Sequence, residues 1–187
     1  MRILILTLIT IVAVALQMHA QDHNQHAIHD RAPADSLKGS PSRLTKATIG
    51  KADVEIAYSS PAVRQRIIWG GLVAYDEVWV TGAHNATSFT FSGSVTINGT
   101  EFAAGKYAFF TIPGRENWTV IFNRNWDQHL ADEYDVKDDL LRFQVTPSES
   151  QQHVERLTYS VIPKNEKTAV IEVAWDSLKI SFEIVGF

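Results

Sequence analysis

The sequence contains no cysteine among its 187 residues. This absence excludes disulfides, thiol catalysis and thiolate metal sites together, so the core must be held by packing alone. A basic cluster is also missing, because 17 Lys and Arg stand against 21 Asp and Glu, giving a formal net charge of −4. A slightly acidic chain without such a cluster lacks the electrostatic footprint of phosphate-backbone binding, and we therefore expect no nucleic-acid partner.

Common catalytic signatures are missing as well. There is no G-x-S-x-G turn, no H-E-x-x-H helix and no phosphate-cradling glycine loop. The usual sequence signals of hydrolases, zinc proteases and nucleotide-binding proteins are therefore absent, although convergent sites need no such motif. We predict no cofactor.

Two sequence patterns resemble metal sites only in part. His23, His26 and His29 recur at every third residue and could hold Zn²⁺ or Cu²⁺, but a polar leader would lose chain entropy to organise them. A calcium-type alternation begins at Asn123, but it then has glutamine at its sixth position and tyrosine at its twelfth, where a calcium loop needs glycine and glutamate. We predict no metal site.

One long apolar run is present, and it lies at the N-terminus. Arg2 is followed by "ILILTLITIVAVAL" and then by "QMHA", the order of a signal peptide with cleavage after Ala20. The run is shorter than the roughly 20 residues that cross a bilayer, which disfavours the alternative of an uncleaved anchor. We predict a signal peptide over 1–20, export to the periplasm or beyond, and no membrane span after cleavage.

The remaining chain divides into a leader and one domain. Residues 21–41 are polar, nearly free of aliphatic residues and end in Gly and Pro, which predicts a flexible leader. Residues 42–187 alternate between apolar and polar positions in many short runs, such as "VEIAYSS", "SFTFSGSVTI" and "LKISFEI". "GKYAFFTIPG" is apolar on both faces, which is typical of a strand covered on both sides.

This pattern predicts an all-β fold: an antiparallel β-sandwich or flattened barrel of about nine or ten short strands. The only helix candidates are a turn or two near Arg64–Trp69 and another near Tyr134–Leu140.

One stretch, Ile68–Ser88 ("IWGGLVAYDEVWVTGAHNATS"), breaks the alternation. Its glycines permit unusual backbone conformations, so we expect the chain to cross here from one sheet to the other and back. Trp69 and Trp79 would then plug one end of the sandwich as an aromatic core. The alternative is that this corner is the floor of a ligand pocket, in which aromatic faces stack on a sugar or a planar ligand.

The candidate site residues follow from this corner. His84 is the candidate general base, but catalysis would need a carboxylate to orient its ring. Two neighbouring arginines could bind a carboxylate or phosphate at the rim. The ligand-binding candidates are Arg64, Arg66, Trp69, Trp79, Thr81, His84, Asn85 and Thr87.

The run from Tyr58 to Asn123, with the motif YSxPxxxxRxIWGGLVxYxxVWxTGAxxAT, resembles a family of secreted bacterial proteins known only as a domain of unknown function. The resemblance implies a signal peptide and a β-rich domain, but no activity or catalytic residue. It also implies basic residues at the positions of Ser60 and Val80, and an Asn-Glu pair at the positions of His84 and Asn85. In this chain that polar cluster has therefore lost its basic residues and its carboxylate and has gained an imidazole.

Three classes of function remain open. The first, which we favour, is an exported module that binds a small molecule or a glycan at the aromatic corner. The second is a hydrolase with His84 as its base. The third is a structural or assembly protein of the envelope that uses an exposed strand edge.

Overall fold

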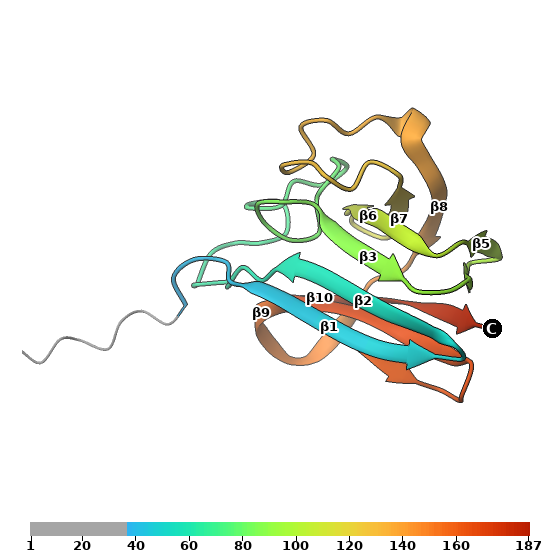
Figure 1. The fold of residues 1–187 in the computed structure, drawn as a ribbon. Coiled ribbons are helices and arrows are strands. Elements are labelled where there is room, and N and C mark those ends of the chain that lie inside the picture. Colours follow the sequence, from blue (N-terminus) through green and yellow to red (C-terminus); the bar gives the residue numbers. More distant parts are fainter. Residues whose placement is uncertain (1–36) are drawn as a thin grey trace, which may run out of the picture. The chain divides into compact units, whose positions relative to one another are not determined.

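The structure is a computed structural model that describes residues 37–187. The predicted signal peptide, and the predicted leader as far as Ser36, lie outside the described residues. The described strands form two antiparallel sheets (Figure 1). The six-stranded sheet has the order β1 (Ser42–Ile49), β2 (Ala52–Ser59), β3 (Thr87–Phe91), β6 (Gly105–Ile112), β7 (Trp118–Asn123) and β8 (Asp139–Val145). The four-stranded sheet has the order β5 (Thr100–Phe102), β4 (Val95–Ile97), β10 (Thr168–Gly186) and β9 (Ser148–Pro163).

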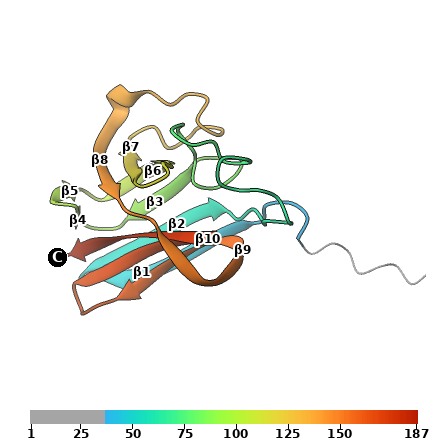
Figure 2. The same ribbon diagram turned by 180° about the vertical axis from the view of Figure 1, so that it is seen from behind.

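The predicted all-β fold is confirmed. The two sheets remain separate and do not close into a barrel, so of the two predicted forms the sandwich is the observed one (Figure 2). The expectation that all strands are short is wrong for β9 and β10, which have 16 and 19 residues. These two strands stay paired across register shifts between Ala174 and Leu178, because local bulges absorb the mismatch.

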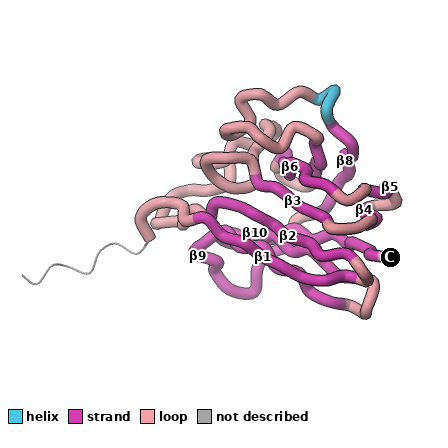
Figure 3. Tube along the Cα trace, viewed as in Figure 1, coloured by secondary structure: helices cyan, strands magenta, loops and turns pink. Residues whose placement is uncertain are grey.

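Helix is nearly absent from residues 37–187 (Figure 3). A single 3-10 turn, η1 (Val136–Asp138), lies within the second predicted helical segment. The first, Arg64–Trp69, contains turns and no helix, and two of its residues, Arg64 and Gln65, have positive φ angles that end any helical run.

The core lies between the two sheets and follows the alternation of the sequence. Val54 and Ile56 of β2 and Ile180 and Ile184 of β10 are among its buried side chains. Phe109 of β6 stacks on Phe182 of β10 with ring centroids 5.8 Å apart, which joins the sheets directly. Burial of each such side chain contributes roughly 1.5–3 kcal/mol relative to exposure, so packing can hold this cysteine-free domain.

A second, smaller cluster covers the outer face of β6 and β7. Ala108, Phe110 and Ile121 point away from the main core and pack against Val80 and Ala86 from the segment before β3. The prediction that "GKYAFFTIPG" is covered on both sides is therefore confirmed. The loops that provide this cover, which precede β3 and follow β7, are the long loops at one end of the domain in Figure 3.

The segment between β2 and β3 leaves one sheet and returns to it. After β2, the amide of Val63 donates to Glu155 O (2.8 Å) and Pro61 O accepts from the amide of Leu157 (3.0 Å), so the chain pairs locally with β9 of the opposite sheet. It returns to β6, where the amide and carbonyl of Trp79 bond to Thr111 (2.8 and 3.0 Å). The predicted crossing is thus observed.

The glycines of this segment act in two ways. Gly70 has a φ of 75°, which favours glycine over other residues. Gly82 does not have a positive φ; a Cβ there would lie 2.8 Å from Thr87 Oγ1, so its role is close packing. No helix in residues 37–187 has the length and apolar character to cross a membrane.

Candidate functional site

Four tryptophans meet at the corner predicted from the sequence. Trp69 and Trp79 contact each other and also Trp118 of β7 and Trp175 of β10, with ring centroids 4.8–6.4 Å apart. Trp118 is 3% exposed and Trp175 is 1% exposed. The tryptophan cluster, defined as these four residues, is therefore an extension of the core.

Packing, rather than hydrogen bonding, holds the tryptophan cluster. Only the indole of Trp79 has an acceptor within residues 37–187, Gly82 O at 3.1 Å. The indole nitrogens of Trp69, Trp118 and Trp175 are buried without a hydrogen-bond partner in this part of the chain, at a cost of roughly 1–3 kcal/mol for each such group. Edge-to-face and stacked contacts between the rings, each contributing roughly 0.5–1.5 kcal/mol beyond area burial, offset part of that cost.

The chain after Trp79 is held in a strained conformation. Thr81 is β-branched and fully buried, yet its φ is 48°, a region that such residues rarely adopt. Its carbonyl accepts from Tyr159 Oη (2.7 Å) and Thr87 Oγ1 (3.2 Å), and its hydroxyl lies 2.9 Å from Thr111 Oγ1. Burial raises the pKa of Tyr159 well above 10.0, so its hydroxyl remains a donor at neutral pH. Thr81 and Thr87 are thus buried parts of the loop framework.

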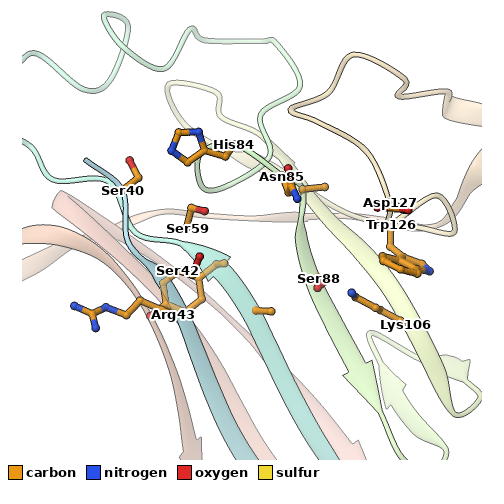
Figure 4. A pocket seen from close by; sticks show the side chains of 13 residues that line it. Ser40, Ser42, Arg43, Ser59, His84, Asn85, Ser88, Lys106, Trp126 and Asp127 are labelled. Carbon is orange, nitrogen blue, oxygen red and sulfur yellow. The ribbon is translucent and has the colours of Figure 1, made fainter. Parts of the chain in front are cut away.

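Between Thr81 and Thr87, this framework turns His84 and Asn85 outward. His84, with a φ of 63°, and Asn85 are exposed and line a groove of about 330 Å³ (Figure 4). The floor of this groove is the outer face of β2 and β3, where Ala57 pairs with Ser88 and Ser59 lies two residues further along. These side chains are small and leave room for the groove, at the bottom of which Ser88 is 4% exposed.

The walls of the groove carry charge and an aromatic ring. Lys106 of β6 places its ammonium 3.7 Å from the ring centroid of Trp126, in the loop after β7, so the two groups form one wall (Figure 4). Arg43 lies on the opposite side in Figure 4, with its guanidinium directed away from Lys106. Asp127 is the one carboxylate in the lining, so the groove has a formal charge of +1 with His84 neutral. We call this site the polar groove.

Of the residues that line the polar groove, only His84 and Asn85 were among the candidates from the sequence, and Lys106 and Trp126 were missed. Trp126 is the more informative of these two. It is 38% exposed and is the one tryptophan outside the tryptophan cluster. The signal that could have found it is its setting in "NRNWDQH", since a tryptophan surrounded by polar residues in a loop is not expected in a core.

No carboxylate in residues 37–187 is bonded to the His84 ring to orient it for catalysis. Among these residues, Asp127 is the only acid that lines the same groove. Asp76, a carboxylate of the same stretch Ile68–Ser88, does not line the groove, and its backbone amide donates to Pro113 O. The geometry thus presents His84 as an exposed polar group that lines the polar groove.

The two candidate arginines lie away from the polar groove. Arg66 donates from its guanidinium to Ala62 O (2.5 Å) and Val63 O (3.1 Å), and it lines a separate cavity of about 280 Å³ next to Trp79 and Trp175. Arg64 donates its backbone amide to Glu155 Oε1 (2.9 Å). Arg64 is exposed and lines neither cavity, and the structure divides the other predicted residues between the two cavities and the core.

The calcium-like segment is used for structure. Asn123 is fully buried; its Nδ2 donates to Asp139 Oδ1 (2.8 Å) and Asp135 O (3.1 Å), and its Oδ1 accepts from the amide of Asn125 (2.8 Å). In the part of the chain that the structure describes, no three His or acidic side chains are placed to share a metal ion. The triad of His23, His26 and His29 falls outside that part.

Comparison with known proteins identifies the family. A family model described as "Protein of unknown function (DUF2911)" matches residues 40–184. The chain belongs to the DUF2911 family. No curated protein and no solved structure matches it. The DUF2911 match begins at Ser40, which lines both cavities, and it includes every residue that lines the polar groove.

The family resemblance implies other residues at Ser60, Val80, His84 and Asn85. These four positions lie in two different environments. Ser60 and Val80 are both buried, and Ser60 Oγ donates to Leu157 O (2.8 Å). His84 and Asn85 are instead exposed in the polar groove. Substitution at the second pair changes the chemistry of the polar groove directly, whereas substitution at the first pair changes buried positions, of which Val80 lines the second cavity.

Proposed function

We propose that this protein is a binding module for small, hydroxyl-rich molecules of the sugar type, which it holds in the polar groove. One observation carries the proposal: the single tryptophan outside the core cluster forms a wall of an open groove together with a lysine.

The chemistry of the lining suits a sugar. The Lys106 ammonium lies over one face of the Trp126 indole, so the exposed remainder of the indole offers the apolar surface for the C–H face of a sugar ring. Lys106 itself donates hydrogen bonds to hydroxyl or carboxylate oxygens. Asn85 both donates and accepts, as do the serine hydroxyls of the floor. A volume of about 330 Å³ falls at the lower end of the range of small-molecule sites, which favours one or two sugar rings.

Binding is better supported than hydrolysis. A general base must be held in position by a second group, and no carboxylate of residues 37–187 bonds to the ring of His84. Its left-handed backbone does fix the direction in which the side chain leaves the loop, which suits a residue that contacts a ligand.

We also propose that binding takes place after export. The order of Arg2, an apolar run and Ala20 supports this, because it is the order of a cleaved signal peptide. N-terminal sequencing of the protein recovered from the cell envelope or the medium tests the point: a mature chain starting at Gln21 is expected, and a chain that retains Met1 in the cytoplasm contradicts it.

Calorimetric titration of the purified protein with a panel of neutral and acidic monosaccharides and disaccharides tests the binding site. At least one sugar is expected to bind, and Trp126→Ala is expected to weaken that binding at least about tenfold, because loss of a central aromatic contact removes 1.4 kcal/mol or more. Ile162→Ala, at a 45% exposed position on β9, is the matched control and should bind as the unmodified protein does. Equal affinity in Trp126→Ala, or no binding by any sugar, overturns the proposal.

A further inference from the structure

The second cavity lies directly across one loop from the polar groove. Gly82 and Ala83 line the second cavity, and the next three residues, His84 to Ala86, line the polar groove. Ser40, at the start of the described domain, lines both. The two cavities are therefore neighbours, separated by the strained turn that begins at Thr81.

The second cavity differs from the polar groove in its chemistry. The stacked rings of Trp79 and Trp175, 5.8 Å apart, form part of its lining together with Val73. Leu72 and Leu130, 50% and 40% exposed, also line it. Arg66 is the one charged residue of this lining, and its guanidinium is bonded to Ala62 O and Val63 O. Exposed leucines beside these aromatic rings form a surface that gains free energy when an apolar group covers it. We call this site the apolar cavity.

From this arrangement we infer that the natural ligand is amphipathic: a sugar that carries an alkyl or aryl substituent, with the sugar in the polar groove and the substituent in the apolar cavity. The inference rests on the proposed function, because it adds a second contact to the same ligand. The shared residue Ser40 and the consecutive lining residues Gly82 to Ala86 support a single ligand, since they make the two sites adjacent.

The gain from the second contact can be expressed as a ratio of affinities. Burial of one methylene group strengthens binding about fourfold, so three or four buried methylenes of an alkyl chain give roughly 60-fold to 250-fold. Partial burial and ordering of the chain reduce this gain, and we expect at least about tenfold. The substituent needs no hydrogen-bonding group, because the tryptophan rings and leucines bind by burial.

Matched pairs of ligands test the inference: methyl and octyl β-D-glucoside, and methyl and octyl β-D-glucuronide, below the concentration at which the octyl compounds form micelles. The octyl member should bind at least about tenfold more tightly, and Leu72→Ser should reduce this advantage while leaving the affinity for the methyl member unchanged. Ile67→Ser is the matched control, because Ile67 is 77% exposed in the same segment but does not line the apolar cavity. Thermal melting of each variant verifies that the fold is intact.

The outcomes separate the two proposals. If methyl and octyl members bind equally, with an affinity that depends on Trp126, the amphipathic ligand is wrong and the sugar site stands. If the octyl advantage persists in Leu72→Ser, the chain is bound elsewhere and the inference fails. If octyl compounds bind but Trp126→Ala changes nothing, apolar contact alone explains binding and both proposals fail.

Discussion

Replacement of Trp79 by phenylalanine is expected to lower the free energy of unfolding by about 2 kcal/mol, whereas the same replacement at Trp126 should change it by less than about 0.5 kcal/mol. At Trp79 the loss has two parts. The indole hydrogen bond to Gly82 O (3.1 Å) contributes about 1 kcal/mol. Reduced ring contact with the other three tryptophans, whose centroids lie 5.8–6.4 Å away, contributes about another 1 kcal/mol.

Within the described residues, replacement of Trp126 removes neither an indole hydrogen bond nor contacts with other tryptophan rings. Its indole makes no hydrogen bond within residues 37–187, and 38% of the residue is exposed. Its contact with the ammonium of Lys106 contributes roughly 0.5–1 kcal/mol at an exposed position, and a phenyl ring retains part of it.

Urea unfolding measures the difference, with far-ultraviolet circular dichroism as the probe because the substitutions alter tryptophan fluorescence. For a domain of this size, about 2 kcal/mol corresponds to a fall in Tm of roughly 4–8 °C. Equal and small effects at both positions would refute the assignment of the tryptophan cluster to the core. A larger effect at Trp126 would show that its loop, rather than the cluster, supports the domain.

Two further predictions concern stability. Tyr159→Phe should cost about 1–2 kcal/mol, because Thr81 O loses its buried donor at 2.7 Å. Burial raises the pKa of Tyr159 well above 10.0, so this hydroxyl ionises at a lower pH in the unfolded chain than in the folded one. The free energy of unfolding should therefore fall as pH rises through 10, and the fall should be smaller in Tyr159→Phe. Identical pH profiles for the two proteins would contradict the argument. Gly186→Ala should destabilise the domain by roughly 1–3 kcal/mol or more, because a Cβ there would lie 1.9 Å from Ile49 O. Gly93→Ala, with no neighbour closer than 3.6 Å, is the control, and similar Tm values for both alanine variants would count against the packing described.

The sequence predicts the fold well because most strands have one buried face. Alternation in "VEIAYSS" places Val54 and Ile56 in the core, and the same rule holds for Ile180 and Ile184 near the C-terminus. The lengths of β9 and β10 were not predictable in this way, because their pairing continues through bulges where the alternation breaks, as at Asp176 with its φ of 55°.

The candidate site was harder to predict, because it depends on contacts between distant segments. Sequence analysis identified His84 and Asn85 from one stretch, but it could not know that Trp126, about forty residues later, lies at the same groove. The isolated bridge between Asn85 and His129 brings these loops together, and no local pattern encodes that pairing. Sequence analysis likewise left open whether Trp79 belongs to a pocket or to the core. The structure shows it in the tryptophan cluster with one side on the apolar cavity.

The five indole N–H groups of the protein provide the most direct test of the central claim, because four belong to the tryptophan cluster and one belongs to the polar groove. Their resonances in a ¹H–¹⁵N NMR spectrum are assigned with Trp126→Phe, which should remove one signal and leave the rest in place. On titration with methyl β-D-glucoside and methyl β-D-glucuronide, the Trp126 signal should shift in a saturable way while the signals of Trp69 and Trp118 stay unchanged. Shifts confined to the cluster, with no response from Trp126, would contradict the assignment of the polar groove as the binding site.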